Sequence, residues 1–411
     1  MRSDTMDFQL TEEQKLIKES VRDWFARNLP LERVREMDTK GHPYPQDIPK
    51  GLGELGVIMG TVPKEHGGQG LDWFTQTLIA EEIGYADPTI ACAAAFMAVA
   101  TGWGYTLDKY CSEEVREMAI KPALKGEKFV GIATTEPGGG SDVAAFKSTA
   151  EKDGDEWVLN GEKTFISGVE EAREWGGGYW VNVRTGEPPE DAPHKNMTSF
   201  FVPIDAEGLE PDKPYRDAGR NALSTGGFRM ENVRIPDSYR LGEEGKGFYR
   251  TMEGFDNARL LIGASSVGVT QRILEEGMKY IKERKTFGKP LAKYEGIQFE
   301  LVELYREMEA TRLMTYKTAW MQDKRYQDGS FKPKDVAKWI SMIKWKAPHL
   351  ALEAANKAMH WLGAAGYSDE YMFEMAWRGV MSYCVGAEGG ENIQKIVIGR
   401  ELLGPDYVPY K

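Results

Sequence analysis

The segment TTEPGGGSD, residues 134–142, decides how the rest of this chain is interpreted. Its three glycines, Gly138 to Gly140, let backbone N–H groups approach an anion closely, and the flanking Thr and Ser hydroxyls add hydrogen-bond donors. A run of three glycines taken alone is more often a plain flexible loop. The segment therefore predicts an anion-binding loop only in combination with the sequence around it.

The residues after this loop have the short period of β-strands. Asp153-Gly154 and Asn160-Gly161, which separate the first strand-like runs, are the strongest short signals for a hairpin turn. We therefore predict a middle antiparallel β domain over residues 129–242. Its strand-like runs span residues 147–151, 156–159, 163–166, 178–184, 198–204 and 227–233.

On both sides of this β domain, apolar residues recur at helical spacing. Thr11 and Gln14 form a capping-box pattern, and the helical run that they begin stops at Pro30. We predict an α+β multidomain fold, with an all-helical N-terminal domain over residues 1–128 and a C-terminal domain like a four-helix bundle over 243–411. The other helical runs span residues 47–55, 74–83, 88–107, 247–284, 296–322, 334–362 and 391–402.

The overall composition excludes several classes of protein. With 411 residues and a formal net charge of −12, the chain is unsuited to nucleic acid as a partner, because such partners require basic surface. Its three cysteines show no CxxC spacing, so we expect neither a disulfide framework nor a metal site. No signal peptide and no membrane span is apparent, which favours the cytoplasm.

With this α, β, α order around it, the segment at residues 134–142 closely resembles the TEPxAGSD loop of the acyl-CoA dehydrogenase family. The resemblance runs from about residue 8 to residue 403 and implies an FAD-dependent enzyme that takes a proton and a hydride from an acyl-CoA thioester. It also implies electron-transferring flavoprotein as the oxidant and a homotetramer built as a dimer of dimers. Further family-like segments are residues 81–83, 255–256 with Arg259, 284–288 and 388–389.

The resemblance places two segments around the isoalloxazine ring of FAD. A reduced flavin carries negative charge near N1 and O2, so aligned donors stabilise it. Phe165 replaces the family's usual Trp and keeps an aromatic face, while Ser167 replaces Thr and keeps the hydroxyl. Ser141 is also expected to contact the substrate. The predicted ring contacts are Ile132, Thr134, Thr135, Gly140, Ser141, Phe165, Ile166 and Ser167.

The resemblance assigns the segment RKTFG, residues 284–288, to the FAD of a neighbouring subunit. An Arg fork pairs well with a pyrophosphate group, although a solvated basic helix end explains this segment equally well on its own. Glu295 stands where the family commonly has Gln, which argues against a contact there. The predicted contacts in this region are Arg284, Thr286, Phe287, Leu291 and Ile297.

A further segment, residues 360–366, matches a family QxxGGxG sequence that reaches the adenosine side of FAD. His360 stands for Gln, and a lone His is more often structural than a ligand, so we predict a cofactor contact rather than a catalyst. Gly363 is expected to lie at the same site. Gly390 and Asn392 complete the predicted cofactor contacts.

The catalytic base is assigned to Glu388, within a segment that resembles the family's YxxYEGTSQIQ. A thioester α-proton is too weakly acidic for an unaided carboxylate, so the enzyme must polarise the carbonyl and bury the base. The spacing from Arg378 to Glu388 is one residue longer than usual, and another alignment would put Ala387 at the position of the base. Some family members place the base at the position of Ala258, which is excluded here.

Other matching positions are expected to contact the substrate. Phe255, Asp256 and Arg259 match residues near the pantetheine arm, although Asp256 and Arg259 also fit an ordinary ion pair on one helix face. Gly389 follows the predicted base and is assigned to the substrate as well.

The helix that passes the end of the acyl chain in this family is rich in small residues here. Ala91, where glutaryl-CoA dehydrogenases carry Arg, and Ala95 are expected to leave room for a bulky apolar acyl group that is cyclic, aryl or branched. Tight helix packing explains the alanines equally well. The alternatives are an acyl-CoA oxidase, an enoyl-CoA reductase, or a catalytically silent protein that binds flavin or acyl-CoA.

Overall fold

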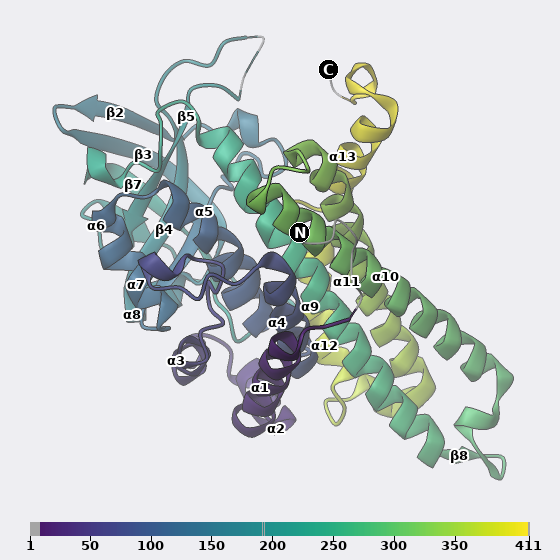
Figure 1. Ribbon diagram of the computed structural model, residues 1–411. Helices are drawn as coiled ribbons and strands as arrows, with labels where there is room; N and C mark the ends of the chain where they lie inside the picture. Colours follow the sequence, from purple (N-terminus) through teal and green to yellow (C-terminus); the bar gives the residue numbers. More distant parts are fainter. Residues whose placement is uncertain (1–8, 191, 193, 410–411) are drawn as a thin grey trace.

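The computed structural model describes residues 9–190, 192 and 194–409. Figure 1 shows helices in the N-terminal part, a sheet at the upper left and long helices that run to the lower right. The predicted fold class is confirmed, with a β region between two helical regions. The predicted boundaries, after residues 128 and 242, fall between elements, and residues 1–8 and 410–411 of the predicted domains lie outside the described residues.

The N-terminal region begins with the predicted capped helix. The Thr11 hydroxyl accepts a hydrogen bond from the Gln14 backbone N–H, and the Gln14 side-chain oxygen accepts one from the Thr11 backbone N–H, so the capping box is confirmed. The predicted helical run over residues 88–107 is not an α-helix throughout, because η2 (Ala93–Thr101) is a π-helix. The α-helices are α1 (Glu12–Asn28), α2 (Leu31–Lys40), α3 (Asp47–Glu54), α4 (Trp73–Ala86), α5 (Gly102–Tyr110), α6 (Glu113–Val115) and α7 (Lys121–Leu124).

The middle region is a seven-stranded sheet in the order β1-β4-β2-β3-β7-β6, with β5 paired to β4. The prediction of antiparallel pairing is correct for four of the pairs but wrong for β4 with β1 and for β4 with β2, which run parallel. The strands between them and α8 (Val169–Trp175) return the chain in the parallel direction. The strands are β1 (Phe129–Ala133), β2 (Thr149–Asp153), β3 (Glu156–Ser167), β4 (Gly177–Arg184), β5 (Met197–Pro203), β6 (Leu209–Pro211) and β7 (Thr225–Pro236).

The two predicted hairpin turns have different outcomes. Asp153-Gly154 joins β2 and β3, and Gly154 has a φ of 62°. The prediction for Asn160-Gly161 is wrong, because β3 continues through it with a bulge in its pairing to β7. A Cβ at Gly161 would lie 2.3 Å from the Ser148 hydroxyl, so this glycine serves a close approach rather than a turn.

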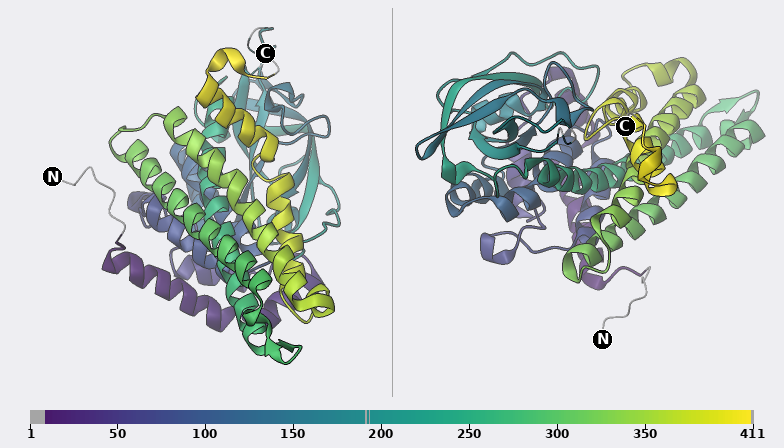
Figure 2. Two further views of the ribbon diagram at one scale, coloured as in Figure 1. Left: turned by 90° about the vertical axis from the view of Figure 1, so that its right-hand side faces the viewer. Right: turned by 90° about the horizontal axis from the view of Figure 1, so that it is seen from above.

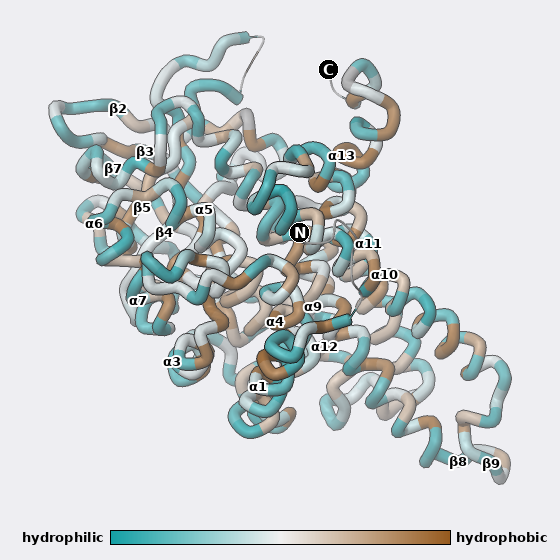
Figure 3. The backbone as a smooth tube through the Cα atoms, in the orientation of Figure 1, coloured by the Kyte–Doolittle hydropathy of each residue, from teal (hydrophilic) through white to brown (hydrophobic). Residues whose placement is uncertain are grey.

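The C-terminal region packs long helices side by side, as Figure 2 shows in two further views. Hydrophilic and hydrophobic residues alternate along these helices in Figure 3, the pattern that a bundle requires. No helix among the described residues is long and apolar enough to cross a membrane, and the same residues contain no group of three His, Cys, Asp or Glu suited to a metal. The helices are α9 (Gly247–Glu283), α10 (Glu295–Gln327), α11 (Pro333–Leu362), α12 (Phe373–Val385) and α13 (Glu391–Leu403).

Candidate active site

A cavity of about 310 Å³ lies where the three regions meet. The π-helix η2 contributes one wall, strands β1 and β3 with the loop after β1 contribute a second, and α9, α12 and the loop at 386–390 contribute a third. Twelve predicted site residues line this cavity together. They are Ile132, Thr134, Thr135, Gly140, Ser141, Phe165, Ile166, Ser167, Phe255, Glu388, Gly389 and Gly390.

The glycine loop is anchored from below by a buried ion pair. Lys163 is fully buried on β3 and donates hydrogen bonds from Nζ to Glu136 Oε1 at 2.8 Å and to the Asn182 carbonyl at 2.7 Å. Glu136 also accepts the backbone N–H groups of Lys147 and Ser148 at 2.6 and 3.0 Å. Burial alone would raise the pKa of Glu136, but Lys163 and these donors hold it below its ordinary value. These contacts fix the position of the loop at Glu136, while its glycines remain open.

Phe165 is held in a costly conformation at the cavity. Its φ of 55° is in the left-handed region, which disfavours side chains with a Cβ, and the side chain is 68% exposed. The ring contacts Tyr215, with the centroids 5.2 Å apart. Strain and exposure of a large apolar ring both indicate a ligand surface.

The residues of this cavity fit a flavin ring. An isoalloxazine ring needs an apolar surface for its face and donors for its oxygen and nitrogen edges. Phe165 offers an exposed aromatic surface, and Thr135, Ser141 and Ser167 bring hydroxyl groups to the same cavity. A Cβ at Gly138 or Gly139 would meet no atom within 4 Å, so this side of the loop remains open to a bound group.

Glu388 lies opposite this loop, in the segment between α12 and α13. Its φ is 52°, and its carbonyl accepts a hydrogen bond from Arg259 Nε at 2.8 Å. Gln394 on α13 donates to the Gly389 carbonyl at 2.9 Å. These contacts fix the backbone on both sides of the Glu388 carboxyl group, which makes no ion pair within 4 Å of a described residue.

The carboxyl group of Glu388 has the electrostatics of a base. Burial raises its pKa above the ordinary value, and the charges of Lys344, Arg259 and Arg220, together with the nearby Trp103 indole, moderate that increase. Lys344 on α11 is only 2% exposed, and burial lowers the pKa of its ammonium group to about 8. A carboxylate with a raised pKa binds a proton more readily than an exposed one.

Two other carboxylates, Asp87 and Glu391, are occupied by other partners. Asp87 is buried, and its carboxylate accepts the backbone N–H groups of Thr89 at 3.0 Å and Cys92 at 2.8 Å. Glu391 pairs at the surface with His349 and Lys395. The geometry therefore favours Glu388.

Asp256 and Arg259 lie beside the cavity rather than on its wall. Arg259 Nη1 is 3.4 Å from an Asp256 oxygen, and Arg325 is 3.7 Å from the other oxygen. Burial raises the pKa of Asp256 and lowers that of Arg259, against the mutual attraction of the pair. Arg259 contacts the Glu388 backbone, so within this chain the pair supports the loop of the predicted base.

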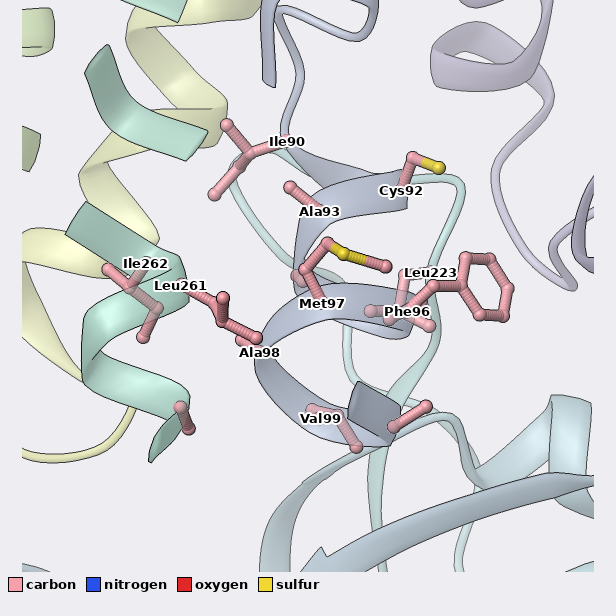
Figure 4. Close-up of a cluster of buried hydrophobic side chains, with 14 of the residues drawn as sticks. Ile90, Cys92, Ala93, Phe96, Met97, Ala98, Val99, Leu223, Leu261 and Ile262 are labelled. Carbon is pink, nitrogen blue, oxygen red and sulfur yellow. The ribbon is translucent and has the colours of Figure 1, made fainter. Parts of the chain in front are cut away.

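The prediction that Ala91 and Ala95 line the acyl cavity is not supported. Both are fully buried, and the cavity is lined instead by Ala94, Ala98 and Val99. The resemblance set the register of these two positions. Ala91 precedes η2, and within η2 the wider turn of the π-helix brings Ala94 and Val99, five residues apart, to the same cavity. Figure 4 shows η2 beside α9, with Ala98 on the side that faces Leu261 and Phe96 on the other side.

The remaining predicted cofactor contacts lie away from this cavity. Phe287 is at the tip of a hairpin, β8 (Lys285–Thr286) and β9 (Lys289–Pro290), at the far end of the bundle in Figure 1, and is 99% exposed. Asn392 is exposed at the start of α13. His360 and Gly363 line a second cavity of about 660 Å³ between α11 and α12. The hairpin and its flanks hold Arg284, Thr286, Leu291, Glu295 and Ile297.

Sequence reasoning missed four polar residues around Glu388: Trp103, Arg220, Lys344 and Tyr383. Lys344 had a usable signal, because it stands on the apolar stripe of α11 with Ile340 and Ala347. Tyr383 is five residues before Glu388, in the segment that carries the predicted base, whereas Trp103 and Arg220 come close to Glu388 only through tertiary packing.

Comparison with known proteins gives consistent matches along the chain. Residues 11–127, 131–233 and 245–403 match the N-terminal, middle and C-terminal domains of acyl-CoA dehydrogenases. The probable acyl-CoA dehydrogenase YngJ of Bacillus subtilis (strain 168) is 33% identical over 399 residues, 97% of this chain and 100% of YngJ. The caffeyl-CoA reductase-Etf complex subunit CarC of Acetobacterium woodii is 30% identical, over 96% of this chain and 99% of CarC. The structure of a glutaryl-coenzyme A dehydrogenase with glutaryl-CoA has a TM-score of 0.88 at 31% identity, covering 99% of both chains.

Proposed function

This chain belongs to the acyl-CoA dehydrogenase family, and from that premise we propose that it oxidises an acyl-CoA thioester between its α and β carbons with Glu388 as the base. The protein is an FAD-dependent oxidoreductase of this class. The observation that carries the proposal is that the Glu388 carboxyl group and the predicted flavin contacts line one cavity.

The residues of this chain have separate tasks in the proposed reaction. FAD, when bound, accepts the hydride from the β carbon. Glu388 accepts the α-proton, and its burial makes it a stronger base than an exposed glutamate. Thr135, Ser141 and Ser167 orient the ring with their hydroxyl groups, and Phe165 covers part of it. Gly389 and Phe255 line the path of the substrate.

We propose a bulky apolar acyl group, which is cyclic, aryl or branched. The small residues Ala94, Ala98 and Val99 from η2 line the cavity on one side. Gly386 and Ala387 line it beside the base, and Ala387 stands where the family segment YxxYEG has Tyr. The missing ring leaves volume next to Glu388, which supports a wide acyl group.

Electron-transferring flavoprotein is the proposed oxidant, supported by the similarity to CarC, which is named as a subunit of a complex with Etf.

We also propose a homotetramer built as a dimer of dimers. Phe287 is almost fully exposed, with a φ of 49° in the left-handed region, and this strained apolar tip suits insertion beside the FAD of a second copy. His360 and Gly363 are proposed to meet the adenosine side of the cofactor.

A second candidate is an enoyl-CoA reductase, favoured by the name of CarC as part of a caffeyl-CoA reductase complex. The site would be the same and the reaction reversed, with Glu388 donating a proton to the α carbon. Turnover of the same CoA pair in both directions with a one-electron dye separates the two candidates.

The substitution Glu388→Gln tests the proposal. Gln keeps nearly the same volume but cannot accept the α-proton, so the anaerobic reduction of the flavin by an acyl-CoA should slow by about 10²–10⁴-fold. FAD content and melting temperature should stay close to those of the parent protein. Stopped-flow absorbance over a broad acyl-CoA panel measures the rate.

Glu391→Gln is the matched control. Glu391 is only three residues after Glu388 but pairs with His349 and Lys395 at the surface, so this substitution should leave the rate unchanged. A Glu388→Gln rate within a few-fold of the parent would exclude Glu388 as the base. A parent protein that binds FAD and is bleached by no acyl-CoA would instead favour a silent binding protein.

A further inference from the structure

A buried arginine lines the cavity with part of its hydrogen-bonding capacity unused. Arg220 is 8% exposed, and its Nη2 donates to Thr225 Oγ1 at 2.8 Å. Nη1 makes only a long contact of 3.4 Å to the Ser167 hydroxyl, and among the described residues Nε has no partner. Asp217, 3.7 Å from Nη2, is partly exposed and also accepts from Thr225, so it neutralises the guanidinium only in part.

A second unused donor faces the same cavity. Tyr383 on α12 is 1% exposed, and its hydroxyl group makes no hydrogen bond of ordinary geometry within the described part of the chain. Ser265 lies close enough to favour the phenolate, yet burial still raises the pKa of Tyr383, so the hydroxyl keeps its proton and remains a donor. The charges of Arg220 and Glu388 both act on this hydroxyl group.

Leaving such groups unpaired is costly. A buried donor without a partner has lost its hydrogen bonds to water and gained none in return, and the loss is larger when the donor is charged. Arg220 has in addition a φ of 61°, in the left-handed region that a residue with a long side chain rarely adopts. Unpaired buried donors and strained backbone are both concentrated at ligand sites, where a ligand can supply the missing hydrogen-bond partner.

We propose that Arg220 and Tyr383 form an anion subsite in this cavity, and that the otherwise apolar acyl group proposed above carries a carboxylate that binds there. The inference rests on the proposed function, because it assigns a chemical class to the same acyl-CoA. The carboxylate accepts hydrogen bonds from the guanidinium group and from the phenol, while the apolar body of the acyl group contacts Ala94, Ala98 and Val99.

Both donors of this subsite come from elements other than η2. The residues of η2 that line the cavity, Ala94, Ala98 and Val99, are all uncharged, so η2 supplies no cation for a carboxylate there. Arg220 instead comes from the loop before β7 and is tied to the ends of β3 and β7 through Ser167 and Thr225. The competing explanation is that Arg220 only clamps this loop to the sheet.

The experiment compares acyl-CoA thioesters in pairs that differ only by a carboxylate. Adipoyl-CoA is paired with hexanoyl-CoA, and the para-carboxy derivative of 3-phenylpropanoyl-CoA with its parent. Dissociation constants come from the change in flavin absorbance on binding, and reduction rates from anaerobic stopped flow. The carboxylate member of at least one pair should be preferred by at least about 10-fold, the value of one charge-assisted hydrogen bond.

Substitution then assigns the preference to these residues. Arg220→Met should reduce the ratio to about one or invert it, Arg220→Lys should keep part of it, and Tyr383→Phe should lower it a few-fold. Arg216→Met is the control, because Arg216 is an exposed arginine of the same loop, outside this cavity, and should leave the ratio unchanged.

The outcomes separate the two proposals. A parent protein that uses both members of every pair equally, or an Arg220→Met variant that keeps the parent ratio, would overturn the subsite and leave the dehydrogenation proposal in place. A parent that binds the carboxylate members preferentially but is bleached by none would support the subsite and contradict the proposed function. If Arg220→Met does not fold, the ratios of Arg220→Lys and Tyr383→Phe decide the matter.

Discussion

Two glutamates line or support the same cavity, each near a buried lysine: Glu136 is buried, Glu388 is half-buried, and their properties are opposite. Glu136 is in direct contact with Lys163, with 2.8 Å between Oε1 and Nζ. Glu388 has no such contact, because the nearby Lys344 donates its hydrogen bond to the Tyr383 carbonyl at 2.6 Å. The pKa of both lysines is lowered to about 8 by burial. Contact therefore makes one carboxylate part of the scaffold, and separation leaves the other available as a base.

The hydrogen bonds explain how the two carboxylates are kept different. Glu136 accepts two backbone N–H groups in addition to Lys163, so its charged form is stabilised and its pKa is low. Lys344 donates instead to the backbone carbonyl of Tyr383. This carbonyl is available because Tyr383 belongs to the last turn of α12, where carbonyl groups lack partners within the helix. Lys344 then acts on Glu388 through its charge rather than by contact.

The largest effect is expected from breaking the first pair with Lys163→Met. Removing one partner leaves the Glu136 charge buried and unpaired, which costs about 3–5 kcal/mol in the free energy of unfolding. Because Glu136 anchors the glycine loop, FAD retention should fall as well. Urea unfolding and the FAD content after gel filtration measure the two effects.

The controls for this variant lie in the same segment. Lys147→Met removes an exposed side chain and leaves the backbone N–H that Glu136 accepts, so it should change little. Adding Glu136→Gln to Lys163→Met should restore part of the lost stability. If the double variant is as unstable as the sum of its parts, the unpaired charge is not the cause.

Removing the second lysine should change acidity more than stability. In the parent protein, flavin reduction should increase with pH as Glu388 loses its proton, with an apparent pKa above the ordinary value for glutamate. Lys344→Met removes a cation that favours the charged carboxylate, so the acid limb should shift to higher pH by about one unit, equivalent to about 1.4 kcal/mol.

At a fixed pH on that limb the rate should fall about 10-fold, and the plateau rate should be kept. Lys346 lies on the same helix as Lys344 and forms a surface ion pair with Glu307 on α10. Lys346→Met removes this pair and should leave the pH of the acid limb unchanged. If Lys344→Met loses stability but the acid limb does not shift, Lys344 serves only to bind the carbonyl at the end of α12 and does not set the acidity of Glu388.

Local signals in the sequence were sufficient for much of the fold. The capping box at Thr11 and the turn at Asp153-Gly154 depend on neighbours within a few residues, and both are present. Asn160-Gly161 carries the same hairpin signal as Asp153-Gly154 but becomes a bulge, and Ser148, just before β2, packs so closely against Gly161 that no side chain would fit there. The parallel pairing of β1 with β4 likewise depends on long-range contacts.

The same distinction applies to the site. Residues in contiguous motifs, such as Ser141, Ser167 and Glu388, lie together in the cavity as the resemblance implied. Arg220 and Lys344 belong to no motif, and their role depends on which faces meet in space. Ala91 and Ala95 were placed by register with the family, and the π-helix that begins at Ala93 gives no pattern in the sequence that distinguishes it from an α-helix.

The smallest expected effect concerns the neutral donor beside Glu388, tested with Trp103→Phe. The Trp103 indole N–H has no hydrogen bond of ordinary geometry within the described residues, yet its proximity lowers the pKa of Glu388. Phe keeps an aromatic ring against Phe255 but removes the donor, so the acid limb should rise by less than in Lys344→Met, because a dipole acts more weakly than a charge. Trp180→Phe is the matched control: Trp180 contacts Trp103, is fully buried and donates its N–H to Asn182 at 3.2 Å. Both variants should lose stability in urea unfolding through lost packing, and only Trp103→Phe should shift the limb. Equal shifts in the two would mean that packing, rather than the indole donor, sets the acidity of Glu388, and the contrast with Glu136 would then rest on the lysines alone.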